Sequence, residues 1–145
     1  FLIVGGGSDE TILKSLVREL KLGNRVIFVG QLSRDEVPKY RKASDIFVAP
    51  SRSEGLGNAF LSAMASRLPV VATREGGLAD FISNEVAWTV RRDSPEQIAD
   101  AVKEIVGHPA RAQEKAARAR EMVEAHYDWD TIAKEMRQKV FSKVI

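Results

Sequence analysis

Short apolar runs rich in branched side chains recur along the chain and alternate with segments of helical spacing. The runs, which are candidate strands, occupy residues 1–4, 26–29, 46–48, 70–72 and 86–90. Between the first two runs, Ile12, Leu16 and Leu20 lie four residues apart and predict a helix. Because strands joined through helices run parallel, this alternation predicts an α/β fold whose sheet is covered on both faces.

The pattern becomes wholly helical in the last third of the chain. Ser94 is expected to cap a helix that has Pro95 at its first position. The Gly-His-Pro run at 107–109 ends that helix and begins another, and a last helix is predicted near Asp128. This last helix carries an apolar stripe: Ile132, Met136, Val140 and Val144.

Length and composition favour one soluble domain of 145 residues, with a sheet region at 1–108 and C-terminal helices at 109–145. Lys and Arg number 22 against 20 Asp and Glu, and this net charge of +2 is too small for a face that binds nucleic acid. The sequence has no cysteine, which excludes disulfides and thiolate sites, and no metal-ligand spacing occurs. We expect a cytoplasmic protein without a metal site.

Two of the loops after candidate strands are interpreted as turns. In open parallel sheets ligands bind at the carboxyl ends of strands, so these loops are where a site is expected. The glycines at 5–7 lack the spacing of a phosphate loop. At the second loop Gly30 lets the backbone turn closely, and Ser33 is expected to cap a helix that opens at Arg34.

The loop around Gly55 and Gly57 carries the strongest chemical signal. These glycines bracket one residue before a helix expected at 59–67, and such a helix start leaves N–H groups free to bind an anion such as a diphosphate. Glu54 suits that place if it accepts hydrogen bonds, for example from sugar hydroxyls. The alternative is that Glu54 caps the helix and the glycines only form a tight turn.

The other candidate residues are weaker. Gly76 and Gly77, preceded by Arg74, form another loop that either faces the same crevice or is a simple connection. His108 and His126 are interpreted as surface or packing residues. Four aromatic residues are expected in the core: Phe47, Phe60, Trp88 and Trp129.

The third and fourth loops carry a family resemblance. The segment at 50–65, PSRSEGLGNAFLSAMA, followed by LPVVAT at 68–73 and the glycines at 76–77, resembles the donor half of the group 1 retaining glycosyltransferases. The resemblance extends from residues 1–5 to 128–129. It implies the three-layer, Rossmann-like parallel sheet of the C-terminal half of a two-domain GT-B enzyme.

The resemblance also implies roles for individual residues. Glu54 corresponds to the first carboxylate of the family's E-x7-E motif, which lies against hydroxyls of the donor sugar, and it is the expected catalytic residue. The turn whose amides would hold the sugar and diphosphate comprises Gly55, Leu56, Gly57, Asn58 and Ala59. The remaining expected contacts are Gly30 and Leu32 at the nucleobase and Gly76 and Gly77 at the back of the donor pocket.

One residue of the motif departs from the family pattern. The second carboxylate, which would hold the ribose, should lie eight residues after Glu54, where the chain has Ser62. A hydroxyl cannot replace both oxygens of a carboxylate, and losing such charge-assisted hydrogen bonds costs about 1.5 to 3 kcal/mol. Ser62 is still expected to face the ribose.

The start of the chain is the second departure. The sequence begins at Phe1 without an initiator Met, and we expect a cut within a larger protein, after the family's first strand, its Arg and Lys loop and its acceptor domain. The strands at 1–4 and 46–48 would flank the absent strand. We expect the gap to be closed by these strands moving together, by a partner chain or by the rest of the protein.

The resemblance implies glycosyl transfer with retention, from a nucleoside diphosphate sugar to an acceptor hydroxyl, without a cofactor or an obligatory metal. The larger protein would be a hexosyltransferase of glycan biosynthesis, associated with a membrane only through its other parts, and the isolated chain would be inactive. Two alternatives remain at this point: a non-catalytic nucleotide-sugar-binding or interaction module, and a sugar-nucleotide epimerase on the same architecture.

Overall fold

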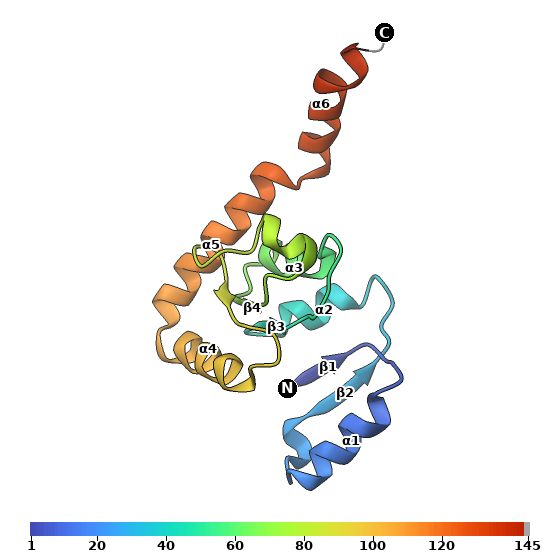
Figure 1. Cartoon of the computed structure of the whole chain (residues 1–145), viewed down its shortest axis with the longest axis vertical. Coiled ribbons are helices and arrows are strands. Elements are labelled where there is room, and N and C mark those ends of the chain that lie inside the picture. Colours follow the sequence, from blue (N-terminus) through green and yellow to red (C-terminus); the bar gives the residue numbers. More distant parts are fainter. Residues whose placement is uncertain (144–145) are drawn as a thin grey trace. The chain divides into compact units, whose positions relative to one another are not determined.

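The computed structural model describes residues 1–143. They fall into two compact units, Phe1–Tyr40 and a second unit that begins at Arg41 (Figure 1). Each unit contains its own parallel sheet. The expected arrangement of residues 1–145 as one domain stays a prediction.

The first unit is a small α/β layer. Its sheet pairs β1 (Leu2–Val4) with β2 (Ile27–Gly30) in parallel, and α1 (Glu10–Glu19) and the short 3-10 helix η1 (Gly23–Arg25) connect the two strands. The strands and the helix predicted from the apolar pattern of this region are confirmed.

The turn after β2 differs from the expectation for Ser33. Helix α2 (Val37–Lys42) begins later than Arg34, because a turn occupies 34–36. The backbone N–H and the hydroxyl of Ser33 both donate to the Glu36 carboxylate, at 2.8 and 2.7 Å. The Ser33 hydroxyl therefore donates to a side chain and does not accept from a helix N–H, as a capping hydroxyl would, and these two bonds lower the pKa of Glu36.

The second unit contains a three-stranded parallel sheet with β4 (Val70–Ala72) between β3 (Phe47–Ala49) and β5 (Trp88–Thr89). The helices of this unit are α3 (Asn58–Ala65), η2 (Gly76–Asp80), α4 (Pro95–Gly107), α5 (Pro109–His126), α6 (Trp129–Lys139) and η3 (Phe141–Lys143). The α/β class with parallel strands is confirmed.

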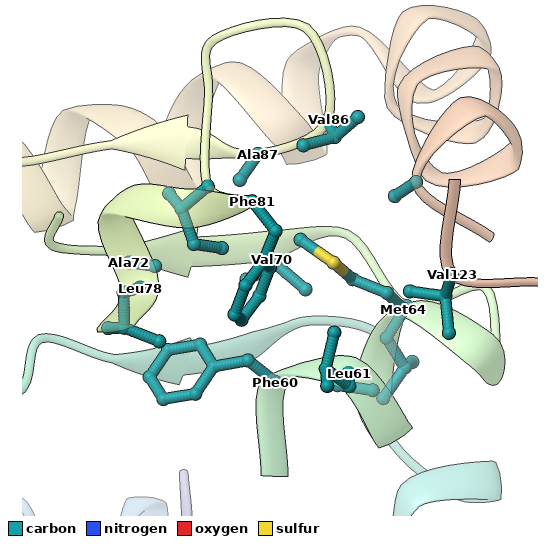
Figure 2. Packing of buried hydrophobic residues seen from close by; sticks show 14 residues of the cluster. Phe60, Leu61, Met64, Val70, Ala72, Leu78, Phe81, Val86, Ala87 and Val123 are labelled. Carbon is teal, nitrogen blue, oxygen red and sulfur yellow. The ribbon is translucent and has the colours of Figure 1, made fainter. Parts of the chain in front are cut away.

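Helices cover both faces of β4, which gives this unit three layers. Val70 and Ala72 point to one face, where three residues of α3 lie in the same buried cluster: Phe60, Leu61 and Met64 (Figure 2). Val71 points to the other face and belongs to a cluster that includes Ala101 and Ile105 of α4. The alternation along a single strand thus places one apolar layer on each side of the sheet.

One aromatic residue expected in the core lies outside it. Trp129 is 81% exposed, whereas Trp88 and Phe60 are buried and Phe47 is half-buried with its ring edge-on to Phe60 at 5.3 Å. Trp129 is the first residue of α6, which extends away from the sheet in Figure 1. The expectation for Trp129 is wrong because no other layer covers this helix among the described residues.

The helix ends of the C-terminal part agree with the sequence except at Ser94. Asp128 caps α6 by accepting from the N–H groups of Asp130 and Thr131 at 3.1 and 3.2 Å. Ser94 occupies the N-cap of α4, but its side chain makes no cap hydrogen bond. Val144, the last residue of the predicted stripe, lies outside the described residues. None of the helices within residues 1–143 has the length and apolar character needed to cross a membrane.

The two strands expected to flank an absent strand belong to different units, and each pairs within its own sheet. In the described part of the chain β1 pairs with β2, and β3 pairs with β4. Closure of the gap by these two strands, by a partner chain or by further residues stays a prediction.

A buried cation lies between α5 and β5. Lys115 is 6% exposed, its Nζ donates to the Ala87 carbonyl at 3.2 Å, and it lies 4.2 Å from the centroid of the Trp88 ring. Burial lowers the pKa of Lys115, and Arg111 and Arg118 lower it further while Glu104 opposes them.

Lys115 should make stability depend on pH in alkaline solution. Between its lowered pKa and the ordinary value of 10.5 the unfolded chain binds more protons than the folded chain, so the free energy of unfolding should rise with pH. Urea unfolding over this range should show a steeper rise for the wild type than for Lys115→Met. The exposed Lys103→Met is the control, and parallel curves for wild type and Lys115→Met would contradict the assignment.

Candidate functional site

The loop between β3 and α3 is shaped by Gly57. This residue is the N-cap of α3 and has a φ of +78°, a left-handed conformation that favours glycine. A Cβ at this position would lie 2.6 Å from Leu78 Cδ2 and 3.2 Å from Phe81 Cζ. Both conformation and space therefore require glycine here, and α3 begins at Asn58, one residue before the predicted start.

Free backbone donors cluster at the start of α3. The N–H groups of Phe60 and Leu61 both donate to the Gly57 carbonyl, at 2.9 and 3.1 Å. Within residues 1–143, no acceptor is found for the N–H groups of five consecutive residues: Gly55, Leu56, Gly57, Asn58 and Ala59. Asn58 and Ala59 lie in the first turn of α3, so an anion at this helix start would gain their N–H groups and the favourable end of the helix dipole, with the loop N–H groups of Gly55 to Gly57 as further donors.

Glu54 does not cap this helix. The N-cap is Gly57 and makes no side-chain cap bond, so the alternative interpretation of Glu54 is wrong. Glu54 is half-buried, and its carboxylate has no hydrogen-bond or ion-pair partner in the part of the chain that the structure describes. A carboxylate beside free N–H groups can accept hydroxyl hydrogens from a ligand that also carries an anion.

The glycines at 76–77 hold the backbone of Glu54 and Gly55. The Gly77 N–H donates to the Glu54 carbonyl at 3.1 Å. A Cβ on Gly76 would lie 2.2 Å from the Glu54 oxygen, and a Cβ on Gly77 would lie 1.9 Å from the Gly55 oxygen. The structure thus brings the third and fourth loops into direct backbone contact, which only residues without a Cβ permit.

Two further contacts on this loop were not singled out by the sequence. The hydroxyl of the buried Thr73 donates to the Ser51 carbonyl at 2.6 Å. The exposed guanidinium of Arg52 binds Asp93 through Nε and Nη2, at 2.8 and 2.7 Å. A polar residue directly after an apolar strand was the available signal for Thr73, whereas nothing in the sequence pairs Arg52 with a residue so distant along the chain.

The remaining residues expected at the site are divided between the two units. Ser62 lies half-buried on α3, and Arg74, which was considered as a cation for the crevice, donates to the Ala79 carbonyl at 3.4 Å. Gly30 ends β2 in the first unit with a φ of +79°, and its carbonyl accepts from Gly5 N–H at 2.8 Å. Leu32 is half-buried in the same unit. The nucleobase role of Gly30 and Leu32 stays a prediction.

A cavity of about 500 Å³ lies elsewhere in the second unit, against β5, α4 and α5. It is lined by polar and charged groups that include Gln97, Glu104, Arg111 and Lys115. Most of these groups already have partners, such as Arg111, which binds Glu104 at 2.8 Å. No residue of the loop at 50–57 lines it, so the free donors, and not this cavity, define the candidate site. Within residues 1–143 no three His, Asp or Glu side chains gather as metal ligands.

The family model described as "Glycosyl transferases group 1" matches residues 1–126, and the chain belongs to this family. The GDP-mannose-dependent alpha-(1-6)-phosphatidylinositol monomannoside mannosyltransferase of Mycobacterium tuberculosis (strain CDC 1551 / Oshkosh) is 35% identical over 140 residues. The match covers 91% of this chain and 36% of that protein.

Solved structures agree with this family. Sucrose-phosphate synthase from Thermosynechococcus elongatus is 33% identical, with a TM-score of 0.87, and the match covers 99% of this chain and 38% of that one. Anabaena HepE in complex with UDP-glucose has a TM-score of 0.87 at 22% identity, covering 97% and 40%, and shows the fold alone. The chain has the fold of the C-terminal half of GT-B glycosyltransferases and spans 36% to 40% of the length of these three proteins.

The contact of Gly77 with Gly55 should be intolerant of a methyl group. Gly77→Ala should lower the free energy of unfolding by about 1 to 3 kcal/mol, because backbone must move to admit the Cβ. Gly107→Ala is the matched control, since nothing lies within 4 Å of its added Cβ, and it should be neutral or stabilising by up to about 1 kcal/mol. Equal stabilities in urea unfolding would contradict the close contact.

Proposed function

We propose that this chain is the donor-binding half of a retaining glycosyltransferase, which moves a hexose from a nucleoside diphosphate sugar to an acceptor hydroxyl. The observation that carries the proposal is the run of N–H groups from Gly55 to Ala59, at and just before the start of α3, together with the preceding Glu54 carboxylate, none of which has a partner among residues 1–143. A diphosphate satisfies the donors and a sugar hydroxyl satisfies the carboxylate. A nucleoside diphosphate sugar supplies both groups in one molecule.

Each group has a separate role in this proposal. The amides of Gly55 to Ala59 bind the diphosphate and adjoining sugar atoms, and Glu54 accepts hydrogen bonds from the sugar. Gly76 and Gly77 keep the Glu54 backbone in place through the contacts described above. The reaction then gains most from positioning and from stabilising charge on the leaving diphosphate, so the chain needs no nucleophile, cofactor or metal.

The relatives support the donor class without fixing its identity. The mycobacterial relative is GDP-mannose-dependent by its name, and the Anabaena structure contains UDP-glucose. These nucleotides and sugars differ, so the proposal names a nucleoside diphosphate hexose and no particular base. Because the chain spans well under half of these relatives, acceptor recognition is assigned to the rest of the protein, and the chain alone is proposed to lack turnover. A cytoplasmic location belongs to the same proposal.

A second candidate function is a nucleotide-sugar-binding module without catalysis. Ser62 favours it, because the residue eight positions after Glu54 has one uncharged oxygen where the family motif has a carboxylate. The donor would then be held mainly through its diphosphate and sugar. Transfer of sugar by the protein that contains this chain separates the two candidates.

The binding proposal can be tested on the 145-residue chain with Glu54→Gln. NMR titration with GDP-mannose, UDP-glucose and ADP-glucose should shift the amide signals of Gly55 to Ala59 for at least one ligand. Glu54→Gln should weaken the affinity for that sugar nucleotide by roughly tenfold or more, because charge-assisted hydrogen bonds are lost. The affinity for the corresponding bare nucleoside diphosphate should change little.

Glu85→Gln is the matched control, because Glu85 is an exposed carboxylate of the same unit outside the loop at 50–57. An equal loss of affinity for the sugar nucleotide and for the bare nucleoside diphosphate in Glu54→Gln would contradict the sugar-binding role of Glu54. Turnover by the 145-residue chain would contradict the assignment of acceptor recognition to other parts of the protein.

Restoring a carboxylate at position 62 tests whether α3 faces the ribose. Ser62→Glu should tighten binding of the ribose-containing ligand, and the melting temperature should rise more with ligand than it does for the wild type. If the side chain instead faces an apolar environment, the variant will lose stability without a ligand-dependent gain. That second result would contradict the placement of Ser62 at the ribose.

A further inference from the structure

The segment after β3 is held at two points by the segment after β4. The hydroxyl of Thr73 donates to the Ser51 carbonyl at 2.6 Å, and the Gly77 N–H donates to the Glu54 carbonyl at 3.1 Å. The pairing of Ala49 with Ala72 brings the two segments abreast at the carboxyl ends of their strands. Residues 51–54 therefore lie between two fixed points.

The first fixed point, the hydrogen bond from Thr73 to Ser51, lies in the interior of the protein. Thr73 is fully buried, and its hydroxyl has this one hydrogen-bond partner among residues 1–143. If this hydroxyl lost its partner, its desolvation free energy would no longer be offset by a hydrogen bond. The bond therefore stabilises the contact between the two segments. Since none of its surface is exposed, Thr73 cannot itself touch a ligand.

The ion pair between Arg52 and Asp93, which also holds this segment, cannot replace the hydrogen bond from Thr73 to Ser51. The side chains of Arg52 and Asp93 are 77% and 56% exposed, and exposed ion pairs contribute little to the free energy of folding. Without the Thr73 hydroxyl, residues 51–54 would be held only through the Gly77 end.

We propose that Thr73 is a positioning residue for sugar recognition: its hydroxyl fixes Ser51 and thereby the backbone that carries the Glu54 carboxylate. The inference rests on the proposed function for its ligand and on the two backbone contacts for its geometry. The amides from Gly57 onward are held by α3, which is anchored in the core through Phe60. Loss of the Thr73 hydroxyl therefore affects the sugar contact more than the diphosphate contact.

The test compares Thr73→Val, which keeps the shape and loses the hydroxyl, with Thr73→Ser, which keeps the hydroxyl. Thr89→Val is the matched control, because Thr89 lies on β5, next to β4, and its hydroxyl donates to the Asn84 side chain, away from the loop at 50–57. Without ligand, Thr73→Val should lower the hydrogen-exchange protection of the Gly77 amide by roughly threefold to tenfold, the effect of about one hydrogen bond. Thr73→Ser and Thr89→Val should leave that protection within about twofold.

The ligand measurement uses GDP-mannose against GDP and UDP-glucose against UDP. Thr73→Val should weaken the affinity for the sugar nucleotide by about threefold to tenfold and the affinity for the bare nucleoside diphosphate by less than about twofold. Thr73→Ser should restore the affinity for the sugar nucleotide. A purely structural role would lower the melting temperature and leave the ratio of the two affinities unchanged, and that result would overturn the proposal. Unchanged Gly77 protection in Thr73→Val would also overturn it.

Failure of the proposed function gives a different result. If the wild type binds none of the four ligands, the donor assignment fails, and the sugar-positioning role of Thr73 falls with it. The Gly77 exchange then still decides whether Thr73 holds the Glu54 backbone.

Discussion

The complete burial of β4 is the constraint on which the second unit depends. Val70, Val71 and Ala72 have no exposed surface, so each face of this short strand must be covered by a helix and each edge by another strand. Parallel pairing with β3 and β5 satisfies the backbone hydrogen bonds that burial would otherwise leave unmade. The same pairing aligns the carboxyl ends of β3 and β4, which is why two loops far apart in sequence meet at one edge.

The site follows from how closely those loops approach each other. A carbonyl oxygen within about 2 Å of a would-be Cβ leaves no room for any side chain, so the glycines at 76–77 are a packing requirement. The contact fixes the Glu54 backbone, and the core residues of α3 fix the amides beyond Gly57. Carboxylate and amides are thus held by different parts of the fold, which lets one be altered while the other stays in place.

The sequence predicted the elements of this fold better than its contacts. Apolar runs and helical spacing located the strands and helices, because the periodicity of buried residues is a local property. Contacts between distant residues, such as that of Thr73 with Ser51, depend on strand register, which no local pattern contains. Trp129 shows the reverse error: its aromatic character predicts burial, but burial also requires a neighbouring layer, and α6 has none among residues 1–143.

The same distinction applies to the candidate site. The G-x-G spacing before a helix predicted free N–H groups, since any helix start leaves them unpaired, and the structure has them. It could not decide whether Glu54 caps α3, because that depends on the φ of Gly57, which places the N-cap three residues after Glu54. Once Glu54 is excluded as a cap, it is a half-buried residue whose carboxylate has no partner among residues 1–143, directly before a run of residues with unbonded N–H groups. A ligand that satisfies both groups must present hydroxyls to the carboxylate and negative charge to the amides. A simple anion satisfies only the amides, whereas a sugar diphosphate satisfies both groups, and for this reason we propose it.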